Sequence, residues 1–92
     1  MRVHFYATLR DVTGTKTVEI DIPDYSTVRQ LVDAVVTRWP PMREILLDPN
    51  GDMYGHVHVF VNGRDAPFLP EKMETVIKPT DVINIFPAVG GG

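Results

Sequence analysis

The last four residues of the 92-residue chain, 89–92 (Val-Gly-Gly-Gly), have types and an order that suit chemistry at a carboxyl terminus. Glycines lack a Cβ atom, so their backbone is narrow enough for a channel that excludes any larger residue. The α-carboxylate of Gly92 is ionised at neutral pH and is a poor acyl donor until it is activated, for example by adenylation. The pattern predicts Gly92 as the reacting residue and Gly90 and Gly91 as the residues that thread into an enzyme. A frayed end without function is the alternative for the glycines taken alone.

Histidine and acidic side chains offer two other kinds of site. His56 and His58 lie two residues apart on one predicted strand face, and His4 lies on another strand that the last strand separates from them. Asp48, Asp52 and His56 suggest acid-base chemistry, but the sequence shows no apolar cleft to hold a substrate. We therefore expect neither a metal site nor catalytic residues.

Composition limits the class of protein. A chain of this length with 43% hydrophobic residues forms one domain. The absence of cysteine excludes disulfides and thiolate sites and makes the cytoplasm the default location. The net charge of −3 without a basic run disfavours nucleic acid as a partner. Neither a signal-peptide layout nor an apolar run of about 20 residues is present, so no membrane association is expected.

The elements that must position the tail follow from hydrophobic periodicity. Apolar residues alternate over residues 3–9 and again over 17–22, with a turn around Gly14, which predicts an opening hairpin. Thr27 followed by Gln30 forms a capping-box signature. It starts a helix over residues 28–39 whose apolar stripe should cover the sheet.

The second half of the chain predicts further strands. A short helical turn over residues 42–47 precedes a strand over 57–61, and Asn62-Gly63 then favours a tight hairpin turn. Residues 64–68 are predicted as a short return strand, and 82–86 as the last strand. This order predicts an α+β fold: a mixed sheet of four to five strands covered by one main helix.

The ending over residues 81–92, together with this element order, resembles the MoaD/ThiS family of ubiquitin-like sulfur carriers, which have the β-grasp fold. The positions that match the family ending are Phe86, Pro87, Val89, Gly91 and Gly92. Ala88 and Gly90 differ from the commonest ending. The Pro-Ala-Val sequence is more similar to CysO-type carriers of cysteine biosynthesis, and archaeal small modifier proteins are also similar.

The resemblance implies a protein co-substrate rather than an enzyme. A ubiquitin-activating-type adenylyltransferase would use ATP to adenylate Gly92, and a sulfur donor would convert the product to a thiocarboxylate. The sulfur would serve the biosynthesis of cysteine or molybdopterin, or the thiolation of tRNA. The acceptor would be a cysteine synthase or the large subunit of a molybdopterin synthase, so the chain would be a monomer or part of a hetero-oligomer. Residues 1–89 would form the domain and 90–92 a flexible tail, with no cofactor bound.

A docking surface also follows from the resemblance. In a β-grasp sheet the last strand lies between the first and the third, so Tyr6, Phe86 and Phe60 should form an outward aromatic row. Exposed aromatic clusters mark partner surfaces, although partial cover by a loop is the alternative. Two other functions stay open: a modifier joined through Gly92 to lysines of target proteins, and an interaction domain with an inert tail.

Overall fold

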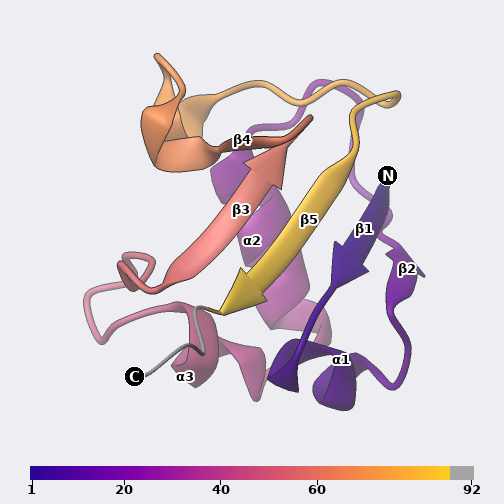
Figure 1. Cartoon of the computed structure of the whole chain (residues 1–92), viewed down its shortest axis with the longest axis vertical. Coiled ribbons are helices and arrows are strands. Elements are labelled where there is room, and N and C mark those ends of the chain that lie inside the picture. The colour runs from indigo at the N-terminus through magenta and orange to yellow at the C-terminus, as the bar shows by residue number, and fades with distance from the viewer. Residues whose placement is uncertain (88–92) are drawn as a thin grey trace.

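The computed structural model describes residues 1–87 and places one sheet against a layer of helices (Figure 1). The strands are β1 (Arg2–Phe5), β2 (Thr17–Glu19), β3 (Val57–Val61), β4 (Arg64–Asp65) and β5 (Ile83–Pro87). The α-helices are α1 (Thr8–Thr13), α2 (Val28–Arg38) and α3 (Met42–Leu46), and two 3-10 helices are η1 (Ala66–Phe68) and η2 (Lys72–Glu74).

The strand order is β2-β1-β5-β3-β4, with β5 in the middle of the sheet. β5 pairs in parallel with β1, with Val3 opposite Ile83, and antiparallel with β3. The outer pairs, β1 with β2 and β3 with β4, are antiparallel. This mixed sheet with one long helix confirms the predicted α+β class and the β-grasp arrangement.

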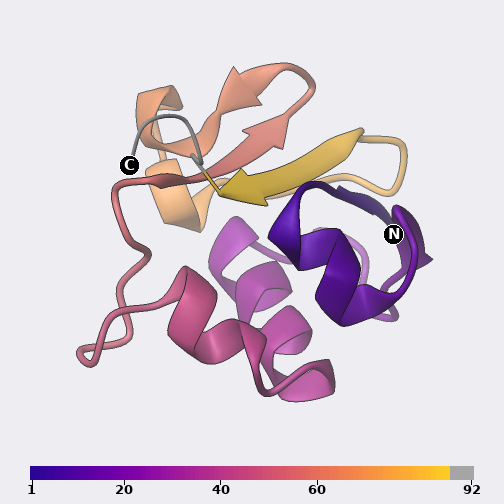
Figure 2. The ribbon, with the colours of Figure 1, turned by 60° about the horizontal axis from the view of Figure 1, so that its bottom comes forward.

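The core lies between the inner face of the sheet and α2, which crosses behind it (Figures 1 and 2). The predicted helical stripe is confirmed, because its five valine and leucine positions within α2 are all buried. On the sheet side, Phe5, Val59, Ile83 and Ile85 have no exposed surface. Trp39 packs edge-on against Phe5 with ring centroids 5.6 Å apart, so the predicted core residues do share one core.

The start of α2 is fixed by the predicted capping box. Thr27 Oγ1 accepts a hydrogen bond from the Gln30 amide, and Gln30 Oε1 accepts one from the Thr27 amide. The guanidinium of Arg29 donates to Glu74 in η2 over 2.6 Å. That hydrogen bond raises the pKa of Arg29 above its ordinary value, so the cation that joins α2 to η2 stays charged.

The predicted first strand over residues 3–9 is wrong beyond Phe5, because the chain turns at Ala7 and forms α1. The predicted turn near Gly14 is present and follows α1. Ala7 makes the turn with φ 55° and ψ −132°. Leu9 is buried in either arrangement, since the helix also directs it into the core. Gly14 ends α1 at φ 81°, where its amide donates to the carbonyl of Arg10.

Two other predicted strands are shorter in the structure. β2 ends at Glu19, although the amide of Ile20 still donates to the carbonyl of Met1 over 2.7 Å. The predicted return strand over 64–68 is limited to β4, and η1 follows it. Pro67 lies within η1 and has no amide hydrogen to donate to a strand ladder.

Replacing Ala7 by glycine is expected to stabilise the domain. A residue with a Cβ atom in this conformation carries about 1 to 3 kcal/mol of strain, which exceeds the entropic cost of a glycine in the unfolded chain. We expect Ala7→Gly to raise the free energy of unfolding by about 1 kcal/mol and the melting temperature by about 4 to 8 °C in calorimetry. The matched control, Ala34→Gly within α2, should lower the free energy of unfolding, because glycine is unfavourable inside a helix. An equal loss in both variants would show that Ala7 is not strained.

Candidate functional site

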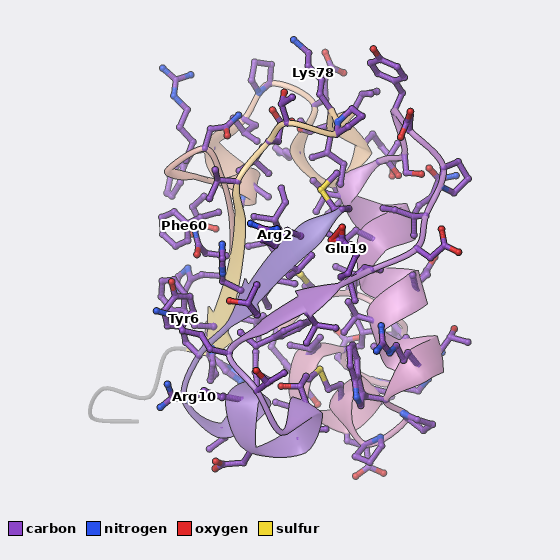
Figure 3. All side chains as sticks on the ribbon, turned by 90° about the vertical axis from the view of Figure 1, so that its right-hand side faces the viewer. Arg2, Tyr6, Arg10, Glu19, Phe60 and Lys78 are labelled. Carbon is purple, nitrogen blue, oxygen red and sulfur yellow. The ribbon has the colours of Figure 1, made fainter. Side chains whose placement is uncertain are left out.

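The outer face of the sheet carries an aromatic cluster of Tyr6, Phe60 and Phe86. Phe60 on β3 stacks on Phe86 of β5, with ring centroids 5.1 Å apart and planes 8° from parallel. Tyr6, just after β1, meets Phe86 edge-on at 5.7 Å. Figure 3 shows Tyr6 and Phe60 on the side of the sheet away from α2. The structure thus brings together the three residues predicted as a partner surface, each of them half-buried.

Polar contacts hold Tyr6 in place at one end of the cluster. Its hydroxyl donates to Asn84 Oδ1 on β5 over 2.9 Å. Lys16 Nζ lies 5.0 Å from the centroid of the ring, a cation–π distance. Tyr6 therefore has a fixed orientation and a cation beside it.

At the other end of the cluster, His58 on β3 contacts Asp65 on β4, an interaction that the sequence analysis missed. His58 Nδ1 and Asp65 Oδ2 are 2.6 Å apart. The Asp65 side chain is only 10% exposed, and its Oδ1 is buried without a hydrogen-bond partner among the described residues. The centroid of the His58 ring lies 5.7 Å from that of Phe86 and 6.1 Å from that of Phe60, so His58 borders the aromatic cluster.

A shallow hollow of about 460 Å³ extends this surface toward η1. It is lined by His58, Phe60, Arg64, Asp65, Phe68 and Phe86. Phe68, which the sequence analysis did not assign to any surface, is 85% exposed. We call these residues together with Tyr6 the outer-face surface.

The predicted reacting residues lie outside the described part of the chain. Gly90, Gly91 and Gly92 follow β5, whose final residue Pro87 is paired opposite Val57. Phe86 is therefore only four positions before Gly90 in the sequence.

Comparison with known proteins connects this geometry to a family. The sequence model described as "ThiS family" matches residues 3–92. The chain belongs to the ThiS family. This family consists of small ubiquitin-like carriers and modifiers and not of catalysts.

Individual relatives agree with this assignment along the whole chain. Small archaeal modifier protein 3 of Haloferax volcanii is 29% identical over 92 residues, covering 100% of this chain and 98% of the relative. The crystal structure of small archaeal modifier protein 1 (SAMP1) from Haloferax volcanii superposes with a TM-score of 0.85 at 29% identity. The match covers 100% of this chain and 98% of that chain. The Amycolatopsis orientalis BexX/CysO complex gives a TM-score of 0.79 at 30% identity, covering 99% and 98%.

Within this ThiS-family fold, the remaining polar candidates have separate structural partners. His4 Nδ1 lies 2.9 Å from Thr17 Oγ1, and the ring of His56 stacks on Tyr54 at 5.0 Å. Asp48 Oδ1 accepts hydrogen bonds from the amides of Asn50 and Asp52, which closes the turn before β3. No cluster of three potential metal ligands occurs in residues 1–87. Nor does any helix among these residues reach the length and apolarity needed to cross a membrane.

Proposed function

We propose that the chain is a sulfur carrier whose terminal carboxylate is converted to a thiocarboxylate. The observation that carries this proposal is the family match, which extends through residue 92 and so includes the glycine ending. The aromatic cluster includes Phe86 of β5, the strand that leads into this ending. This position supports the proposal, because a carrier needs a surface through which a partner holds the protein while its terminus reacts.

In the proposed reaction, a ubiquitin-activating-type adenylyltransferase binds the outer-face surface through Tyr6, Phe60 and Phe86. Gly90 and Gly91 thread into the enzyme and place the carboxylate of Gly92 against the α-phosphate of ATP. A carboxylate oxygen attacks that phosphorus, pyrophosphate leaves, and an acyl-adenylate forms. Hydrosulfide (HS⁻) then attacks the acyl carbon, AMP leaves, and loss of the S–H proton gives the terminal thiocarboxylate.

Delivery of this sulfur requires a second partner. We propose that the acceptor is a biosynthetic enzyme, either a cysteine synthase or the large subunit of a molybdopterin synthase, in whose active site the terminal sulfur is shielded from water. The chain itself is a co-substrate that binds no cofactor and is otherwise monomeric. We propose the cytoplasm as its location, because a chain without cysteine has no feature that favours an oxidising compartment.

A second function uses the same activated terminus. The relative named small archaeal modifier protein 3 favours a modifier whose Gly92 becomes linked to lysine side chains of target proteins. In that reaction a lysine amine, instead of a sulfur nucleophile, attacks the activated acyl carbon. The product is then a larger covalent adduct and not a free protein.

Mass spectrometry of the intact chain distinguishes these products. After incubation with its cognate adenylating enzyme, ATP and sulfide, we expect the chain to gain about 16 Da, the exchange of one oxygen for sulfur. A reaction without ATP is the control and should leave the mass unchanged. Lysine-linked adducts without the thiolated species would favour the modifier. If neither product forms, the function that remains is an interaction domain with an inert tail.

A further inference from the structure

Two of the three asparagines in the chain are followed by glycine, and these two pairs lie at opposite ends of β3. Asn50-Gly51 lies in the loop between α3 and β3, and Asn62-Gly63 forms the turn between β3 and β4 (Figure 1). An asparagine before glycine is chemically reactive, because glycine has no Cβ atom to keep its amide nitrogen away from the preceding side chain. All four residues are exposed, so exposure alone does not distinguish the two pairs.

The reaction open to such a pair is deamidation. The main-chain nitrogen of the glycine gives its proton to the solvent and attacks Cγ of the asparagine, the bond from Cγ to Nδ2 breaks, and ammonia leaves after taking a proton from water. The product is a succinimide ring, which water opens at either carbonyl to give an aspartate or an isoaspartate. For this attack the side-chain amide must turn toward the next main-chain nitrogen.

The side-chain amide of Asn62 is held at both of its ends. Its Nδ2 donates to Asp81 Oδ1 over 2.9 Å, and its Oδ1 accepts from the amide of Val82, also over 2.9 Å. Asp81 is itself fixed, because its Oδ2 accepts from the amide of Lys78 over 2.7 Å. The side chain of Asn62 can therefore reach the nitrogen of Gly63 only after both of its hydrogen bonds have broken.

Asn50 lacks these restraints. Within residues 1–87 its main-chain amide donates to Asp48 Oδ1 over 2.8 Å, whereas its side-chain amide has no hydrogen-bond partner. Asp48 holds the main chain of the turn, since its carbonyl accepts from the amide of Gly51 over 2.9 Å and its Oδ1 also accepts from the amide of Asp52. The hydrogen bonds of an exposed turn break far more often than the whole domain unfolds. The turn at Asp48 therefore slows the attack by Gly51 but does not prevent it.

We propose that Asn50 is a site of spontaneous deamidation in the folded protein, and that the contacts with Asp81 and Val82 protect Asn62 from the same reaction. The reaction consumes only water and needs no partner, so the inference is independent of the proposed function. Because the ammonia is lost to solvent, the modified fraction increases with the age of the molecule. An isoaspartate at position 50 also adds one atom to the main chain between Asp48 and Asp52, which disturbs the turn that Asp48 closes.

Mass spectrometry of proteolytic peptides from the full chain, aged in mildly alkaline buffer, tests the inference. Each deamidation adds about 1 Da, because an NH2 group is exchanged for OH. In the native protein we expect Asn50 to react at least about tenfold faster than Asn62, since each hydrogen bond that must break lowers the reactive population. In urea the two sites should react at similar rates, because the protection of Asn62 depends on the fold. If Asn50 reacts no faster than Asn62 in the native protein, the inference is wrong.

Two variants test the individual contacts. Asp81→Ala removes the acceptor of Asn62 Nδ2 and should speed deamidation at Asn62 about tenfold. Asp48→Ala removes the side-chain acceptor of the turn and should speed the reaction at Asn50. Asp52→Ala is the matched control, since the turn uses only main-chain atoms of Asp52 and the rate at Asn50 should not change.

Thermal unfolding shows whether each variant retains the fold. An unchanged rate at Asn62 in folded Asp81→Ala would overturn the protection assigned to Asp81. If that variant does not fold, the comparison of the native wild type with the wild type in urea still decides whether the fold protects Asn62.

Discussion

Removal of Gly92 is expected to abolish adenylation by the cognate enzyme, and addition of one residue after Gly92 should do the same. One residue moves the carboxylate by about 3.3 to 3.6 Å along an extended chain. A displacement of about 1 Å already costs about a hundredfold in a reaction that depends on positioning, so the loss should exceed that factor. The melting temperature should not change, since every core residue in the described range 1–87 lies upstream of the tail. Pyrophosphate release measures the rate.

A bulky side chain at Gly91 should act in the same way by blocking the channel through which the tail threads. The matched control is Gly55→Leu, because a Cβ atom at Gly55 meets nothing within 4 Å and the residue does not need a positive φ. Adenylation of Gly91→Leu at the wild-type rate would contradict the threading of the tail. Thiolation of every tail variant would contradict the carrier proposal as a whole.

Phe86→Ala is expected to weaken binding to the activating enzyme by about 1 to 3 kcal/mol, the range of a central aromatic anchor. Phe86 touches the rings of Tyr6, Phe60 and His58, so its loss removes the centre of the aromatic cluster. Phe60→Ala should also weaken binding to the activating enzyme. Titration calorimetry gives the affinity, and thermal unfolding shows whether the fold is retained.

Tyr25→Ala provides the control for loss of an exposed aromatic ring. Tyr25 is 65% exposed in the loop before α2 and does not belong to the outer-face surface, so binding should not change. If Phe86→Ala and Phe60→Ala both bind and melt like the wild type, the aromatic cluster is not a docking surface.

The sequence predicted the parts of the fold in which local pattern and tertiary packing agree. The stripe of α2 and the alternation in β3 and β5 each have one arrangement that buries their apolar side. The capping box at Thr27 is a local signal that agrees with the start of that stripe. The segment after β1 lacks this property. Leu9 is buried whether residues 3–9 form a strand or a turn followed by α1, and Ala7 gives no sign of its positive φ. Periodicity alone therefore could not locate the end of β1.

The aromatic cluster was predictable because the resemblance placed β5 between β1 and β3. To predict the contact between His58 and Asp65, the register of the hairpin formed by β3 and β4 was needed as well. A two-residue turn at Asn62-Gly63 pairs Val61 with Arg64 and Phe60 with Asp65. Asp65 is then the diagonal neighbour of His58 on the same face, two residues along β3. The turn signal contained this information, but no pattern in the sequence indicated how deeply Asp65 would be buried.

The position of β5 in the middle of the sheet also affects how the protein matures. Its parallel partner Val3 is 80 positions away in sequence from Ile83 (83 − 3), and β3 reaches β1 only through β5. During translation, β1 to β4 leave the ribosome without the strand that joins them, so the sheet closes only after residues 83–87 have emerged. Closure of the core and assembly of the aromatic cluster therefore both require β5. A nascent chain without β5 has neither, and an activating enzyme would meet the surface only on chains that have already folded.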